Sequence, residues 1–193
     1  MSTLGSLDII PFESASLWEG WLAENHARSQ GIWLQIYKKA SGKQTVTYAE
    51  ALDGALCYGW IDGQKQKHDE QSWLQKFTPR RPRSIWSKNN TRNVERLMEA
   101  GKIKPAGLKE VETAKRDGRW DNAYVPIREA TLPEDFLREL TKDPKAQAFF
   151  GTLNQAHTFA IAYRLQSAKK PETRERRMKA MLDMLSRGEK LYG

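Results

Sequence analysis

The sequence predicts an α+β protein, with a small antiparallel sheet packed with helices and a helical C-terminal section after it. Strand patterns cluster early in the chain and helical periodicity dominates late, without the alternation that βαβ units require. Hydrophobic residues make up 39% of the chain and charged residues 29%, which is typical of a globular protein. We therefore expect an α+β domain over residues 1–125 and a helical module over residues 132–193.

The expected sheet rests on three short segments. In GIWLQIYKK, residues 31–39, apolar side chains alternate along one face while aromatic strand formers occupy the other. Residues 60–78 predict a hairpin with Asp69 and Glu70 near its turn, and prolines at positions 79 and 82 end its second strand. A short edge strand is expected at DIIPF, residues 8–12.

Helix starts are marked by residues whose side-chain oxygens can accept hydrogen bonds from free backbone N–H groups. The expected caps are Ser14 or Ser16 for the first helix, Thr47 with Glu50 as a capping box for the second, and Ser84 or Ser87 for the third. A fourth helix is expected between Pro105 and Gly118.

The stretch RWDNAYVPIREATLPED, residues 119–135, has no periodicity and contains two prolines, so it is the best linker candidate. Helical patterns follow it to the end of the chain. Pro133, Pro144 and Pro171 stand where helices begin, and Gly188 stands where the last one ends.

Charge and composition restrict the partners. Thirty-two basic residues against 24 acidic ones give a formal charge of +8, which favours nucleic acid, phosphorylated metabolites or an acidic surface, although a basic protein without such a partner has the same balance. The single cysteine excludes an intramolecular disulfide. No secretory pattern and no membrane-length apolar run is evident, so we expect a cytoplasmic protein without a membrane span.

The most distinctive segment is FTPRRPRSIWSKNN, residues 77–90, which carries four basic residues and no acidic one. Arginine forks bind phosphate or carboxylate, and a helix start adds free N–H groups, so one interpretation is an anion site. The other is a basic surface loop whose arginines pair with the protein's own carboxylates. Trp86 would either pack or line a pocket. The candidate ligand-binding residues are Arg80, Arg81, Arg83, Ser84, Trp86, Ser87, Lys88 and Asn89.

Catalytic and metal-binding candidates are few. Asp62 in GWIDG is a weak catalytic candidate, which could act as a base, bind a metal or pair with an arginine of the basic stretch, and the pairing is favoured. Cys57 lies on an apolar helical stripe and is expected to be buried rather than nucleophilic. Three scattered histidines and one cysteine lack metal-ligand spacing, and no nucleotide-binding loop occurs, so we expect no metal and no cofactor.

Several motifs in this order are familiar: GIWLQIYKK, EALDGALCYGWIDG, FTPRRPRSIWSKNN, RLMEAGKIKPAGL and AKKPETRERRMKAMLDMLSRGEK. Over nearly the whole chain the series resembles the YdeI/OmpD-associated family, also labelled bacteriocin-protection. From the basic stretch we expect a binding module for an anionic small molecule or a protein partner, and the resemblance implies that it is linked to bacteriocin or antimicrobial stress protection. Two alternatives remain open: an enzyme acting on a small anionic substrate, and a nucleic-acid-binding protein, which is less favoured.

Overall fold

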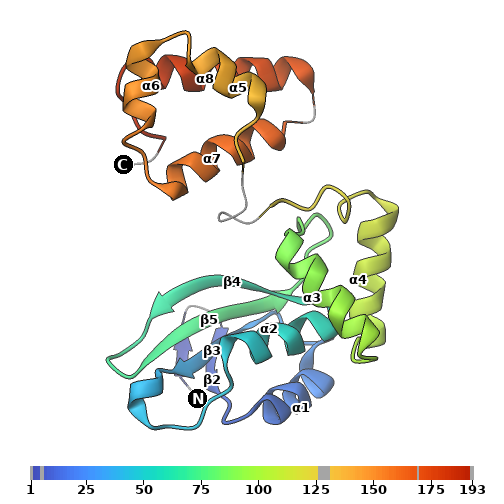
Figure 1. Ribbon diagram of the computed structural model, residues 1–193. Helices are drawn as coiled ribbons and strands as arrows, with labels where there is room; N and C mark the ends of the chain where they lie inside the picture. The colour runs from blue at the N-terminus through green and yellow to red at the C-terminus, as the bar shows by residue number, and fades with distance from the viewer. Residues whose placement is uncertain (1, 5–6, 126–130, 169, 192–193) are drawn as a thin grey trace. The chain divides into compact units, whose positions relative to one another are not determined.

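The computed structural model describes residues 2–4, 7–125, 131–168 and 170–191. The chain divides into two compact units, residues 1–123 and 124–193 (Figure 1). The first unit combines a sheet with helices and the second contains helices, so the predicted α+β class with a helical C-terminal section is confirmed.

The sheet of the first unit has five strands in the order β1-β2-β3-β5-β4. Strands β2 and β3 run parallel, and the other neighbouring pairs are antiparallel. The expectation of a purely antiparallel sheet was therefore wrong for this one pair. The strands are β1 (Ser2–Leu4), β2 (Leu7–Pro11), β3 (Ile32–Tyr37), β4 (Trp60–Lys67) and β5 (Ser72–Pro79).

The parallel pair has a physical cause in the helix between its two strands. Helix α1 (Ala15–Asn25) carries the chain back along the sheet, so that β3 starts from the same end as β2. Such a crossover is the usual way to join parallel neighbours. The predicted hairpin is confirmed, because β4 and β5 pair antiparallel, with Lys67 opposite Trp73 near the turn.

The helices of the first unit begin at the predicted capping residues. Ser14 caps α1, and Thr47 and Glu50 form both bonds of a capping box. Of the two serines considered for the third helix, Ser87 is the cap. After α1 come a short 3-10 helix η1 (Lys39–Ser41), α2 (Tyr48–Cys57), α3 (Lys88–Glu99) and α4 (Pro105–Arg116).

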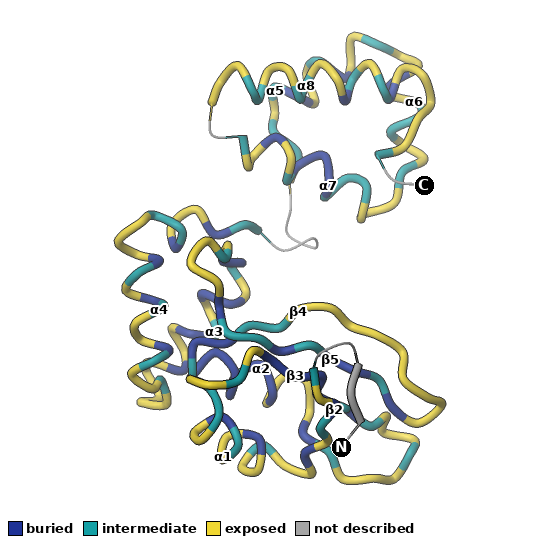
Figure 2. Tube along the Cα trace, turned by 180° about the vertical axis from the view of Figure 1, so that it is seen from behind, coloured by how far each residue is buried: buried dark blue, intermediate teal, exposed yellow. Residues whose placement is uncertain are grey.

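The main core lies between the helices and one face of the sheet, and indole rings occupy its centre. Trp18 and Trp60 are almost completely buried, at 0% and 1% exposed. Each buried indole N–H donates to a backbone carbonyl, Trp18 Nε1 to Ala51 O at 2.9 Å and Trp60 Nε1 to His26 O at 3.1 Å. Figure 2 shows the contrast with edge strand β4, which is exposed along most of its length.

Part of the expected linker is packed rather than extended. Trp120 and Ala123 are 8% and 6% exposed and belong to the core of the first unit. The packing of Trp120 and Ala123 was not predicted because the segment forms turns, and the buried residues of turns follow no sequence periodicity. Residues 126–130 of the expected linker lie outside the described residues.

The second unit packs short helices around its own apolar core. Two of its helices begin with the predicted prolines at their first helical position, Pro144 and Pro171. The buried core residues are Phe136, Leu140, Ala146, Ile161, Leu165, Met181 and Leu185. The helices are α5 (Glu134–Leu140), α6 (Pro144–Phe150), α7 (Gln155–Gln166) and α8 (Pro171–Ser186). Throughout the described ranges, none of the helices is both long and apolar enough to cross a membrane.

Candidate functional site

The candidate site is the basic loop, residues 80–87, together with the start of α3. The loop leaves the end of β5, where the backbone N–H of Arg80 donates to Gly59 O at 3.0 Å. A tight turn follows, closed by the N–H of Ser84 donating to Arg81 O at 2.8 Å. Pro82 occupies the first corner of this turn, where its fixed φ is favourable. The loop therefore has a defined backbone although it belongs to no helix or strand.

Arg80 points inward and anchors the loop. It is 7% exposed, and its guanidinium carbon lies 3.5 Å from the centre of the Trp86 ring. Its Nη1 also donates to Ile85 O at 3.4 Å. Trp86 is 2% exposed and packs against Trp120, with ring centres 4.9 Å apart. Two of the predicted ligand-binding residues, Arg80 and Trp86, are thus placed where they hold the loop from beneath.

A second anchor comes from Arg119, which no sequence motif marks. Its Nη1 donates to the carbonyl oxygen of Ser84 at 2.8 Å, and its guanidinium pairs with Asp117 at 2.7 Å. The hydrogen bonds from Arg119 lower the pKa of Asp117. Arg119 lies in the aperiodic stretch after α4, so no sequence pattern pointed to its contact with a loop 35 residues earlier.

Three cations of the site remain open to solvent or nearly so. Arg81 and Arg83 are exposed, and Lys88 is of intermediate exposure. None of them forms an ion pair with a residue in the described part of the chain, whereas Arg96 on α3 pairs with Asp53 at 2.6 Å. Arg81 and Arg83 therefore do not pair with carboxylates of the described residues, and the interpretation of the loop as an anion site stays a prediction.

The start of α3 contributes backbone groups. Ser87 is 9% exposed, and its Oγ accepts from the N–H of Asn90 at 3.2 Å, so this predicted ligand residue acts as the helix cap. Lys88 and Asn89 occupy the first two helical positions, whose N–H groups have no partner inside a helix. These N–H groups and the helix dipole both favour an anion.

Asp62 lies on β4 and is not joined to the arginines of the loop. Its Oδ2 accepts a hydrogen bond from Tyr48 Oη at 2.7 Å, across from the start of α2. Among the residues that the structure describes, it forms no ion pair with Arg80, Arg81 or Arg83. The expected pairing of Asp62 with an arginine of the basic stretch is absent there, and Asp62 orients a tyrosine instead.

Cys57 and the histidines add no reactive centre to this site. Cys57 is 6% exposed, and burial, the largest cause, raises the pKa of its thiol to about 11. A thiol held protonated in this way is a poor nucleophile. Within the described ranges, no group of three or more His, Cys, Asp or Glu side chains could hold a metal ion.

Comparisons with known proteins assign the two parts of the chain to different families. Residues 10–110 match a domain of unknown function, DUF8412, and residues 129–188 match the family described as bacteriocin-protection, YdeI or OmpD-associated. The resemblance to the second family was expected over nearly the whole chain, but the matched segment is confined to the helical unit. Searches of curated proteins and of solved structures gave no match. The chain belongs to the DUF8412 family and carries, over residues 129–188, a YdeI/OmpD-associated segment.

Proposed function

We propose that the first unit is an anion-binding module and that Arg81, Arg83 and Lys88 are its ligand-contacting cations. One observation carries the proposal: the basic loop is fixed from beneath by Arg80 on Trp86 and by Arg119 on Ser84, while its outer arginines form no ion pair with a described residue. A loop that is already ordered loses little conformational entropy when it binds.

The ligand class follows from the donors. Arginine side chains present planar forks that match carboxylate and phosphate, and the first N–H groups of α3 suit the same oxygens. The exposed turn can reach an anionic group displayed on a larger molecule, and its donors also match the phosphate of a small metabolite. Asn89, which is exposed, would add an amide donor at the edge of the site.

The biological setting of this binding is part of the proposal. The family matched by residues 129–188 is described as bacteriocin-protection, and we propose that recognition of an anion or partner by the first unit serves a role of that kind. An enzyme acting on a small anionic substrate is less well supported, because Asp62 is engaged with Tyr48 rather than with the cations of the loop.

The test is ligand-induced stabilisation of the purified full chain, measured as a thermal shift against phosphorylated metabolites, nucleotides and short oligonucleotides at low and moderate salt. A ligand present at 100 times its Kd adds about 2.7 kcal/mol of stability. We expect the double variant R81A/R83A to fold normally and to lose the shift. Arg80 is left in place because its removal would disturb the loop itself.

The matched control is R116A/R138A, which removes the same charge from exposed positions elsewhere. Retention of the shift in the control and its loss in R81A/R83A would support the site. If both double variants lost the thermal shift equally, the stabilisation would come from net charge and not from the loop. If no anion shifted the melting temperature of the wild type, the proposal would be wrong. Stabilisation by oligonucleotides alone, falling steeply with salt, would replace it with nucleic-acid binding.

A further inference from the structure

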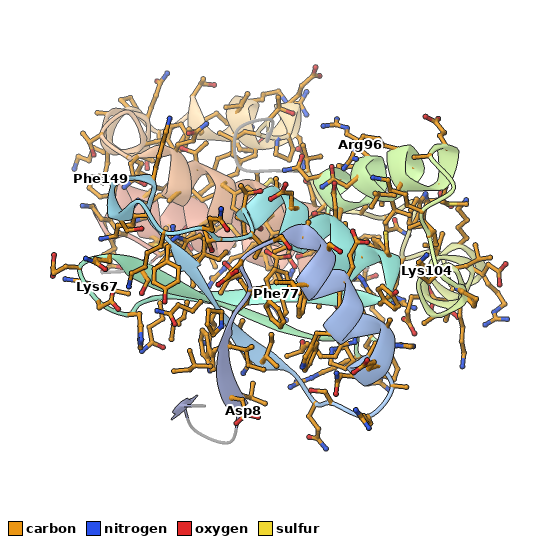
Figure 3. The ribbon with its side chains drawn as sticks, turned by 90° about the horizontal axis from the view of Figure 1, so that it is seen from below. Asp8, Lys67, Phe77, Arg96, Lys104 and Phe149 are labelled. Atoms are coloured by element: carbon orange, nitrogen blue, oxygen red, sulfur yellow. The ribbon has the colours of Figure 1, made fainter. Side chains whose placement is uncertain are left out.

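An open groove runs along the outer side of α1, in the same unit as the basic loop but on another element. Its volume is about 630 Å³. In the view from below, α1 lies in the foreground of the unit (Figure 3). The lining residues are Pro11, Phe12, Glu13, Ser16, Leu17, Gly20, Trp21 and Glu24. None of them belongs to the anion site proposed above.

The floor of the groove is a rigid aromatic surface. The Trp21 ring is stacked on that of buried Trp18, with centroids 5.5 Å apart and planes inclined by 14°. It also meets Trp60 edge to face at 5.8 Å and lies 6.2 Å from Phe12. Three rings pack against Trp21, which is of intermediate exposure, so its indole offers a supported apolar surface to a partner.

Beside this floor, the helix leaves an apolar side chain uncovered and a space unfilled. Leu17 is 54% exposed, one turn before Trp21 on the same side of α1. A Cβ built at Gly20 would meet no atom within 4 Å. The middle of the helix therefore has an exposed leucine, an accessible tryptophan face and room for an incoming side chain.

Carboxylates stand at the two ends of the groove. Glu13 and Glu24 are exposed, and neither forms an ion pair with a residue in the described ranges. Glu13 precedes the N-cap of α1 and Glu24 lies in its last turn, and the nine helical steps from Ala15 to Glu24 alone span roughly 14 Å along the axis. On a chain of formal charge +8, this groove thus presents a local acidic rim around an apolar floor.

We propose that the α1 groove binds a basic amphipathic peptide segment of another protein, with apolar side chains on Leu17 and Trp21 and cationic side chains at Glu13 and Glu24. The spacing of the carboxylates decides against a small organic cation, because one charge cannot reach both ends. About three turns of helix carry cations far enough apart to do so. The apolar floor requires the amphipathic pattern in addition to positive charge.

The experiment uses the full chain and a fluorescently labelled probe peptide of about four helical turns, with leucine along one face and lysine along the other. Binding is measured by fluorescence anisotropy. A second probe has every lysine replaced by glutamate. We expect saturable binding of the basic probe. The acidic probe should not compete with it for the groove, and any binding that the acidic probe shows should be lost in R81A/R83A, because the basic loop is the surface proposed to take carboxylates.

Two variants of the groove and one control locate the binding. Gly20→Leu places a side chain in the open space, starting from a Cβ that would have no atom within 4 Å, and E13Q/E24Q removes the rim charges while keeping the shape. Each should weaken binding of the basic probe at least about tenfold, which is 1.4 kcal/mol. Glu19→Gln removes an exposed carboxylate of the same helix outside the groove and should leave the Kd unchanged.

Two results would overturn the proposal. One is unchanged binding in Gly20→Leu, which would place the peptide elsewhere on the surface. The other is a wild-type chain that dimerises with concentration while Gly20→Leu stays monomeric, because the groove would then be occupied by a second copy. Neither result depends on the anion site, whose arginines are intact in all of these variants.

Discussion

The basic loop and the α1 groove each place a buried residue next to an exposed one, but the loop displays positive charge and the groove displays negative charge. In the loop, Arg80 is buried on an indole ring while Arg81, its neighbour, is exposed. On α1, Trp18 is buried while Leu17, its neighbour, is 54% exposed. In both regions one residue anchors the segment and a residue adjacent to it in the sequence faces outward. The comparison teaches that the net charge of the chain does not predict the charge of a local surface, because the same chain carries a cationic loop and an acidic groove.

The largest effect should come from removing the anchor of α1. Trp18→Ala would leave a cavity between helix and sheet, and we expect it to lower the free energy of unfolding by about 3–5 kcal/mol. Its neighbour is the control, because Leu17→Ala changes an exposed site and should stay within about 0.5 kcal/mol. Urea denaturation of both variants measures the difference. Similar losses of unfolding free energy in Trp18→Ala and Leu17→Ala would mean that Trp18 does not anchor α1 more than Leu17 does.

The same division in the loop should give a smaller effect. Arg80→Ala removes a desolvated cation–π contact, and we expect a loss of about 2 kcal/mol. Arg81→Ala should stay within about 0.5 kcal/mol of wild type. Denaturation midpoints at equal slope report both values. An Arg81 variant as unstable as the Arg80 variant would make the outer arginine structural and weaken the proposed anion site.

A glycine on α1 tests whether its outer side is open, and a buried glycine on another helix is the contrast. Gly20→Ala adds a methyl group where no atom lies within 4 Å, so we expect stabilisation of about 0.5–1 kcal/mol from helix propensity. Gly107→Ala, on α4, is the opposite case, because its Cβ would clash with the backbone carbonyl oxygen of Cys57. Overpacking there should cost about 1–3 kcal/mol. Destabilisation by Gly20→Ala in a melting experiment would show that the groove is filled.

The regular parts of the fold were predictable because their signals are local. The capping box at Thr47 and Glu50 and the hairpin around Asp69 are fixed by residues a few positions apart, and both were found. The parallel pairing of β2 with β3 was missed, since pairing direction depends on where α1 places the chain. The packing of Trp120 was missed because turns have no period.

The candidate site was predictable as a segment and not as a set of contacts. Sequence alone marked residues 77–90 as basic, but it could not separate Arg80 from Arg81 and Arg83. In a helix or strand, periodicity tells which neighbour faces inward. In an irregular loop, orientation depends on tertiary partners such as Trp86 and Arg119, which no local pattern identifies.

The smallest expected effect concerns an arginine that, unlike Arg81, is paired inside the protein. Arg174 on α8 forms two hydrogen bonds to Asp135, at 2.6 and 2.8 Å, and these bonds lower the pKa of that carboxyl. A lowered pKa gives stability that is present above the ordinary aspartate value and is lost as the pH falls through the folded-state value.

Because both side chains of this pair are about one-third exposed, we expect Asp135→Asn to cost at most about 1 kcal/mol at neutral pH. The difference from wild type should begin to shrink below about pH 4, where the carboxyl of the unfolded chain takes up a proton, and should disappear only below the lowered folded-state pKa. Denaturation at a series of pH values measures it, with Arg81→Ala as a variant whose effect should not change with pH in this range. A pH-independent cost of Asp135→Asn would mean that the pair acts through packing rather than charge, and the contrast between paired and open arginines would then lose its electrostatic basis.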